Sequence, residues 1–253
     1  MPPRRRGKRK RRHTLAETCE AKEIHSTGYH LFRQAVVVDT ATRAHLERRS
    51  RSMKGVIFNN QAAGNDRKRR QKRLCFGAAH TKNGVLDKFA GDLSAFIRER
   101  ISETLRPADW VLLKSAAGCH RQVAHTDYEP SEELAAAPHD QVPLLVIVAL
   151  QDKTTLDVWP GSIKLISKLE CLGSSALAAQ PEIQRTQLHM NEGDILVFRA
   201  DLVHAGSAYD AENVRIHCFL DSDTVPRPPG ATFRMDRASR EHPEIARIIR
   251  DIV

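Results

Sequence analysis

The sequence lacks long hydrophobic runs and has few aromatic residues. No apolar segment approaches the roughly 20 residues that cross a bilayer, which excludes a transmembrane helix. The first residues also lack the apolar stretch of a secretory signal, so we expect the protein to stay inside the cell. Aromatic residues make up only 5% of the chain, too few to predict the base-stacking platform that binds single-stranded nucleic acid.

Cysteine is also scarce, and its spacing is irregular. The chain has an odd number of cysteines and no Cys-x-x-Cys motif. This pattern favours reduced thiols, as in the cytosol or nucleus. Cys119 precedes His120, and such a pair can bind a metal, but we interpret it as part of a loop. The five cysteines are Cys19, Cys75, Cys119, Cys171 and Cys218.

Acidic residues are missing from two strongly basic runs. Residues 4–12 hold eight Lys or Arg, and residues 67–73 hold six more. The net charge of the whole chain is +9, so the rest of the protein is mildly acidic, at about −5. Such runs attract nucleic acid and other polyanions, or the receptors that read nuclear-import signals, although plain solvated charge is an alternative. They favour a nuclear over a cytoplasmic location.

Length and patterning predict a single domain. The 253 residues suffice for one barrel-sized fold with a sizeable core. We expect a disordered basic tail over residues 1–13 and one domain over residues 24–253. Within this domain, residues 39–105 would form a helical support that includes a basic surface loop over residues 61–73.

Two helices are predicted in this support. Asp39 is a suitable N-cap for a helix over residues 40–53. Between Gly84 and Leu105, apolar residues recur at spacings of three and four and form one apolar stripe. Arg106 and the following proline would end this second helix.

The barrel core is predicted over residues 110–221, which contain many short strands separated by turn signals. Residues 144–150 are apolar on both faces, as expected of a central strand. Together these patterns predict a mainly β fold with supporting helices, the double-stranded β-helix or jelly-roll, cupin-like barrel. The strands of the core are expected at residues 110–115, 122–127, 143–151, 155–159, 184–190, 194–199, 202–207 and 214–221, and two earlier ones at 28–38 and 54–60.

Three residues near the ends of predicted strands could hold a metal ion. His125 and Asp127 are two positions apart, so an extended chain points both side chains to one face. His204 closes another strand-like run. Two neutral imidazoles and one carboxylate suit Fe(II) and leave positions open for other ligands. A His-x-Asp tripeptide alone decides nothing, and ordinary polar residues near strand ends are the alternative.

This region resembles the 2-oxoglutarate and Fe(II)-dependent dioxygenases, most closely their phytanoyl-CoA dioxygenase-like branch. Residues 112–118, followed by His-Thr-Asp-Tyr at 125–128, look like the first iron-binding strand of that branch. Residues 155–162 are similar to its strand that ends in Pro-Gly-Ser. Residues 192–198, with His-Ala-Gly at 204–206, look like the strand pair that bears the second histidine.

The resemblance implies an enzyme that binds Fe(II) through His125, Asp127 and His204 and uses 2-oxoglutarate and O2 as cosubstrates. Arg215 would bind the far carboxylate of 2-oxoglutarate, because a guanidinium presents parallel donors and stays charged inside a barrel. Relatives that halogenate have a small residue in place of the carboxylate. Asp127 therefore favours hydroxylation or oxidative demethylation, with decarboxylation of 2-oxoglutarate to succinate.

The resemblance covers residues 110–221, a little under half of the chain, and three positions depart from it. The family usually has His after Pro-Gly-Ser, where this chain has Ile163. It often has Ser two residues after the second iron histidine or after the arginine, where this chain has Gly206 and His217. The lesser contacts to the cosubstrate are therefore not carried over from the family.

Three hypotheses remain for the partner of this site. The first is an oxygenase that acts on a small molecule or an acyl conjugate. The second is the same chemistry on nucleic acid or a nuclear protein, reached through residues 4–12 and 67–73. The third is a non-catalytic jelly-roll module that binds polyanions, although such a module would not need the full set of site residues. No membrane partner is expected. Insertions at residues 129–142 and 169–185 are candidates for a lid and a substrate wall, or are plain surface insertions.

Overall fold

The computed structural model describes residues 18–53, 66–75, 84–131, 134, 142–166, 180–222, 232–241 and 243–252. The predicted basic tail at 1–13 and the predicted strand at 54–60 lie outside these ranges. The strands are β1 (Tyr29–Phe32), β2 (Arg69–Arg73), β3 (Leu105–Ser115), β4 (His125–Thr126), β5 (Leu144–Ala149), β6 (Thr154–Val158), β7 (Thr186–Met190), β8 (Ile195–Arg199), β9 (His204–Gly206), β10 (Asn213–Ser222) and β11 (Phe233–Arg234). The helices are α1 (Cys19–Thr27), α2 (Thr40–Arg51), α4 (Val85–Arg100), α6 (Ser162–Ile166), α8 (Met235–Glu241) and α9 (Pro243–Ile248).

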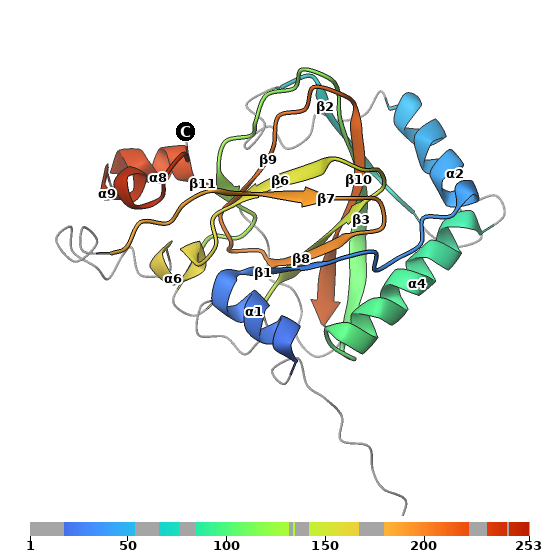
Figure 1. Cartoon of the computed structure of the whole chain (residues 1–253), viewed down its shortest axis with the longest axis horizontal. Coiled ribbons are helices and arrows are strands. Elements are labelled where there is room, and N and C mark those ends of the chain that lie inside the picture. Colours follow the sequence, from blue (N-terminus) through green and yellow to red (C-terminus); the bar gives the residue numbers. More distant parts are fainter. Residues whose placement is uncertain are drawn as a thin grey trace, which may run out of the picture.

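The strands form two antiparallel sheets that pack against each other (Figure 1). The larger sheet has the order β1-β8-β5-β10-β3-β2, and the smaller has the order β11-β4-β9-β6-β7. Between β3 and β10 the chain passes from one sheet to the other several times. Residues that are far apart in the sequence therefore meet in the space between the sheets, as in a jelly roll.

The central strand β5 shows how the core is divided. All six of its residues are buried. Leu145 and Ile147 pack between the sheets with Leu156 and Val158 of β6. The alternate residues of β5 belong to a second cluster, together with the apolar stripe of α4. A strand points successive side chains to opposite faces, so β5 contributes side chains to both clusters. The prediction of a central strand over 144–150 is confirmed.

Helices α2 and α4 cover one flank of the larger sheet (Figure 1). The Asp39 carboxylate accepts a hydrogen bond from the Thr42 backbone N–H at 2.7 Å, so the predicted N-cap is confirmed. The second helix, predicted to reach Leu105, ends at Arg100. That prediction was wrong by about one turn, because Leu105 instead opens β3 and pairs with Ser222 of β10. Apolar spacing within the chain does not reveal a strand partner more than a hundred residues away.

Two further predictions differ from the structure at the sheet edges. The strand predicted over 28–38 ends at Phe32, and the backbone of Gln34 turns with φ of 46°. The predicted basic loop at 61–73 is correct only in part. Its first residues lie outside the described ranges, but Arg69–Arg73 form β2, which pairs with β3 at the edge of the larger sheet. Five consecutive polar residues gave no apolar alternation from which to predict a strand.

Helices α8 and α9, which the sequence did not reveal, lie on the flank opposite α2 and α4 (Figure 1). Trp159, completely buried at the end of β6, donates its indole N–H to Arg250 O at 2.5 Å. A parallel bridge between Ile183 and Ile249 adds a second link. The C-terminal helices are thereby attached to the smaller sheet.

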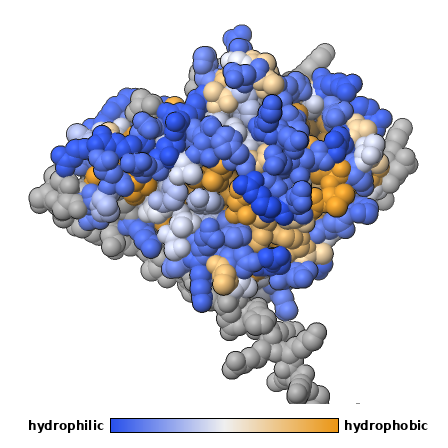
Figure 2. All heavy atoms as spheres, viewed as in Figure 1, coloured by the Kyte–Doolittle hydropathy of each residue, from blue (hydrophilic) through white to orange (hydrophobic). Residues whose placement is uncertain are grey.

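The surface of the described part of the chain is mainly polar. In the view of Figure 2, hydrophilic residues cover most of the face and hydrophobic side chains appear in scattered places. Among the described residues, Val37 is the one large hydrophobic side chain with high exposure, at 78%. No helix within these ranges is both long enough and apolar enough to span a bilayer.

Candidate metal centre and arginine pair

The candidate metal ligands converge on the inner face of the smaller sheet. His125 in β4 lies directly opposite His204 in β9 in an antiparallel pair, so both side chains project from the same face. Their ring centroids are 4.4 Å apart. The backbone N–H of Asp127 donates to Ala200 O at 2.9 Å, and this bond fixes the turn after β4. The turn brings the carboxylate beside the two rings.

The geometry of these three side chains suits a single metal ion. Asp127 Oδ1 lies 3.9 Å from His125 Nε2, and Asp127 Oδ2 lies 3.7 Å from His204 Nε2. The three ligand atoms all lie within 4.8 Å of one another, and no other group of this kind occurs among the described residues. Two imidazoles and one carboxylate, with no fourth protein ligand, are the donor set of non-haem Fe(II) sites with open positions.

Both histidines are oriented by backbone carbonyl groups two residues before them. His125 Nδ1 donates to Val123 O at 2.8 Å, and His204 Nδ1 donates to Leu202 O at 3.0 Å. A carbonyl oxygen only accepts, so Nδ1 carries the proton and Nε2 keeps its lone pair for a metal. Burial lowers the pKa of His125 to about 4, and the neighbouring imidazole of His204 adds to this effect. His125 is therefore neutral near pH 7, which is the form that binds metals.

Arg215 lies inside the barrel, on the larger sheet. In β10 it is opposite Ala149 of β5, which belongs to the core between the sheets, so the arginine points to the same side. The residue is 1% exposed. Its Nη1 donates to Ser115 Oγ at 3.2 Å and to Asn213 Oδ1 at 3.3 Å.

A second arginine, Arg69, reaches the same space. It opens β2 opposite Ser115 and is 0% exposed. Its Nη1 donates to Ser115 Oγ at 3.0 Å, and its Nη2 donates to Gly206 O at 3.1 Å and to Ser207 O at 2.7 Å. Burial lowers the pKa of Arg69 to about 10, and the neighbouring charge of Arg215 adds to this effect. We call Arg69 and Arg215 the arginine pair.

The arginine pair has little negative charge around it. The carboxylate of Asp66 lies 3.9 Å from Arg69 Nε, and no described residue forms a salt bridge with Arg215. Arg215 Nε and Gln122 Nε2 are buried donors without an acceptor in the described part of the chain. Two buried cations and two unused donors are costly unless an anion completes the site. The arginine pair is therefore suited to binding an anionic group.

Gly206 connects the metal ligands with the arginine pair. It lies two residues beyond His204 on β9, so the two positions share a face and are about 6.6 Å apart along the strand. Its N–H donates to Gln122 Oε1 at 2.7 Å. A Cβ at this position would overlap Gln122 Oε1 and lie 3.0 Å from Arg69 Nη1. The departure from the resembled family at Gly206 thus leaves room for the second arginine.

Comparison with solved structures identifies the fold. The epimerase SnoN, crystallised with Fe3+, alpha-ketoglutarate and nogalamycin RO, has a TM-score of 0.59 and 17% identity, over 85% of this chain and 86% of that one. HygX from Streptomyces hygroscopicus, with nickel, 2-oxoglutarate and hygromycin B, has a TM-score of 0.55 and 14% identity, over 83% and 88%. A prolyl-4-hydroxylase from Pseudomonas putida has a TM-score of 0.52 and 11% identity, over 85% and 100%.

The fold is the double-stranded β-helix. The predicted fold class is thereby confirmed. No family model and no curated protein sequence matches the chain. The chain is similar in fold to solved structures of non-haem, 2-oxoglutarate-dependent enzymes. Its resemblance to the phytanoyl-CoA dioxygenase-like branch stays a prediction.

The four predicted site residues all lie within this barrel. Three of them form the cluster on the smaller sheet, namely His125, Asp127 and His204. Arg215 lies on the larger sheet, which faces it. Sequence reasoning missed Arg69, because a basic residue within a basic run gives no sign of burial. Most of the candidate lid at 129–142 and of the candidate substrate wall at 169–185 lies outside the described ranges.

Proposed function

We propose that the protein is an Fe(II)- and 2-oxoglutarate-dependent dioxygenase. One observation carries the proposal: a two-histidine, one-carboxylate cluster and a buried arginine pair share the interior of one double-stranded β-helix. Among the described residues, Arg215 has no carboxylate partner. SnoN was crystallised with Fe3+ and alpha-ketoglutarate, and HygX with nickel and 2-oxoglutarate. The donor types and the cationic pocket of this chain match that pair of ligands.

Each residue of the site has a role in this proposal. His125, Asp127 and His204 hold the iron on one face, and their fixed Nε2 lone pairs need no reorganisation to bind it. Arg215 and Arg69 bind the far carboxylate of 2-oxoglutarate, and Ser115 holds the two guanidiniums in place. When bound, iron with 2-oxoglutarate and O2 supplies the oxidising chemistry, and 2-oxoglutarate is converted to succinate.

The reaction that we propose is hydroxylation or oxidative demethylation of a small molecule or an acyl conjugate. Asp127 is retained as a carboxylate, which favours these outcomes over halogenation. The two hypotheses that involve polyanions rest on residues 4–12, which lie outside the described ranges, and on residues 67–73. Arg69 belongs to the second run but is buried inside the barrel, so it does not contribute to the surface charge.

The test is succinate formation by the purified full chain with Fe(II), 2-oxoglutarate and O2. We expect wild type to form succinate slowly without an added substrate and the Asp127→Ala variant to form none, with a parallel loss of bound iron. Asp210→Ala is the matched control, because Asp210 is an exposed carboxylate that does not belong to the cluster of three ligands. Full-rate turnover by Asp127→Ala would show that the metal assignment is wrong.

A further inference from the structure

A pocket with three arginines borders the candidate metal centre. Strand β11 pairs with β4, and Arg234 lies directly opposite His125. Opposite residues in an antiparallel pair project from the same face, so Arg234, His125 and His204 form one row across three strands. Neighbouring strands are about 4.8 Å apart. Arg234 is therefore the next side chain beyond the metal ligands on the inner face of the smaller sheet.

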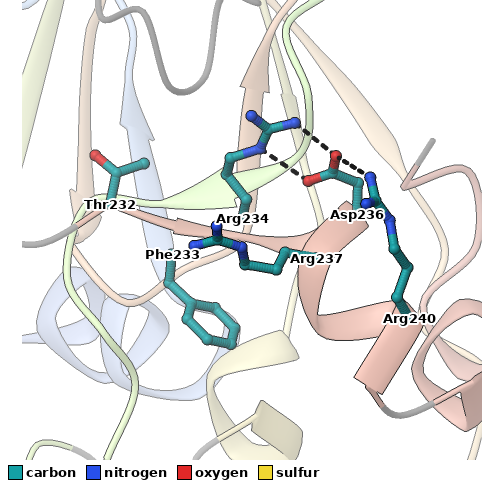
Figure 3. Close-up of a pocket in the computed structure, with 6 residues that line it drawn as sticks. All are labelled: Thr232, Phe233, Arg234, Asp236, Arg237 and Arg240. Carbon is teal, nitrogen blue, oxygen red and sulfur yellow. Dashed lines mark hydrogen bonds and ion pairs between the residues drawn. The ribbon is translucent and has the colours of Figure 1, made fainter.

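The pocket has a volume of about 360 Å³ and is lined by the side chains drawn in Figure 3. Its lining holds three guanidiniums and one carboxylate. The lining residues are Thr232, Phe233, Arg234, Asp236, Arg237 and Arg240. Asp236 compensates one of the three charges, so the lining has a surplus of two positive charges.

The single carboxylate mainly serves to hold Arg234. Asp236 accepts from Arg234 Nε at 2.9 Å and from Arg234 Nη2 at 2.5 Å, in a two-pronged pair (Figure 3). Arg240 Nη2 lies 3.5 Å from the same carboxylate, at a more exposed position. These contacts fix the plane of the Arg234 guanidinium and leave its Nη1 available to a ligand.

Arg237 makes no ion pair with any residue that the structure describes, and it is exposed. In Figure 3 its guanidinium lies between Phe233 and Arg234. Arg237 lies beside two other guanidiniums in this lining. Because like charges repel, these neighbours do not stabilise its positive charge. The three side chains together present the planar, multi-donor surface that binds an oxyanion, with Phe233 as an apolar wall.

We propose that this arginine pocket binds an oxyanionic group, a phosphate or a carboxylate, of the substrate that is oxidised at the metal centre. The inference rests on the proposed function for the oxidation, and it adds the chemical class of the substrate. The anion would be held by Arg237, Arg240 and Arg234 Nη1. Arg234 lies one strand spacing from His125, so the rest of the same molecule would extend from Arg234 over the metal.

The test measures binding of phenyl phosphate, benzoate and the uncharged benzyl alcohol to the full chain loaded with Fe(II) and 2-oxoglutarate under anaerobic conditions. We expect wild type to bind the two anions about tenfold more tightly than benzyl alcohol, and the R237Q/R240Q variant to lose about tenfold for the anions only. Phenyl phosphate and benzoate separate a phosphate substrate from a carboxylate substrate.

The control is R48Q/R98Q, which removes the same charge from exposed arginines on α2 and α4 that form no ion pair with any described residue. It should bind both anions like wild type. Equal binding of the anions by wild type and R237Q/R240Q, an equal loss in the control, or no preference of wild type for the anions would each overturn the proposal. Should the double variant unfold, R237Q decides in its place, because Arg237 forms no ion pair with any residue in the described ranges.

Succinate formation without an added substrate separates this inference from the proposed function. R237Q/R240Q should retain wild-type succinate formation, because the arginine pocket is distinct from the arginine pair. If wild type forms no succinate, the proposed oxygenase fails whatever the binding result. If wild type forms succinate but the anions bind equally to wild type and variant, the oxygenase stands and the substrate class is wrong.

Discussion

Arg69 and Arg215 both donate to the hydroxyl of Ser115, from the two strands that flank β3. The distances to Ser115 Oγ are 3.0 and 3.2 Å. Each guanidinium is buried, and together they form the cationic end of the candidate cosubstrate site.

The first prediction concerns Arg69. Replacing it by Gln should raise the KM for 2-oxoglutarate by about ten- to hundredfold, the loss expected for one or two charge-assisted hydrogen bonds, while iron binding is retained. Steady-state succinate formation and metal content measure the two effects. Arg70→Gln is the matched control, because Arg70 is the next residue on β2 and points to the opposite face. Equal loss of iron and cosubstrate binding would indicate misfolding, and an unchanged KM would show that Arg69 is only structural.

The second prediction concerns Gly206. A methyl group there would overlap Gln122 Oε1 and crowd Arg69, so Gly206→Ala should displace both side chains. We expect a loss of about 1–3 kcal/mol in the free energy of unfolding and weaker 2-oxoglutarate binding. Gly91→Ala, in the exposed middle of α4 with no atom within 4 Å of the new methyl, should instead stabilise the protein by about 0.5–1 kcal/mol. Chemical denaturation measures the free energy of unfolding of both variants. If Gly206→Ala were as stable as Gly91→Ala, the methyl group at position 206 would not clash with its neighbours.

The third prediction concerns the buried ion pair in the turn before His204. Arg199 Nε and Nη2 donate to Asp201 at 2.8 and 2.7 Å, and both residues are nearly inaccessible. Arg199→Met alone should cost about 3–5 kcal/mol, because it leaves a buried carboxylate without a partner. The double variant Arg199→Met/Asp201→Leu should recover most of that loss, since no buried charge remains. A double variant as unstable as the single one would contradict this explanation.

The fourth prediction concerns thiol reactivity. Burial raises the pKa of the Cys218 thiol far above its usual range, while Cys19 is exposed. At pH 8 in native protein, iodoacetamide should therefore modify Cys19 and leave Cys218 intact, because the thiolate is the reacting form. In denaturant both should react at similar rates. Mass spectrometry of peptides reads out each site, and rapid native modification of Cys218 would mean that β10 opens.

The sequence predicted the parts of this molecule that depend on local patterns. The continuous apolar run in β5, the cap at Asp39 and the strand-end positions of His125 and Asp127 are all local features. The sequence could not predict the end of α4, because Leu105 pairs with a residue of β10 that lies more than a hundred positions later in the chain. Nor could it predict Arg69, since the burial of this residue comes from the pairing of β2 with β3, which no pattern within a basic run encodes.

The C-terminal part of the site was unforeseen for the same reason. Residues 233–241 contain several arginines and little apolar periodicity, so the sequence suggested no strand there. Their place beside the metal ligands follows from two residues of β11 that pair with β4. A pairing of two residues is too short to leave a periodic signal.

The carbonyl groups of Val123 and Leu202 aim the two imidazoles before any ion arrives. The chain, and not the metal, thus sets the shape of this centre. Stripping with a chelator should leave a folded apoprotein whose secondary structure is unchanged, and which takes up Ni(II) or Fe(II) again on simple addition. Metal exchange in this protein would then be a reversible loading step that requires no refolding.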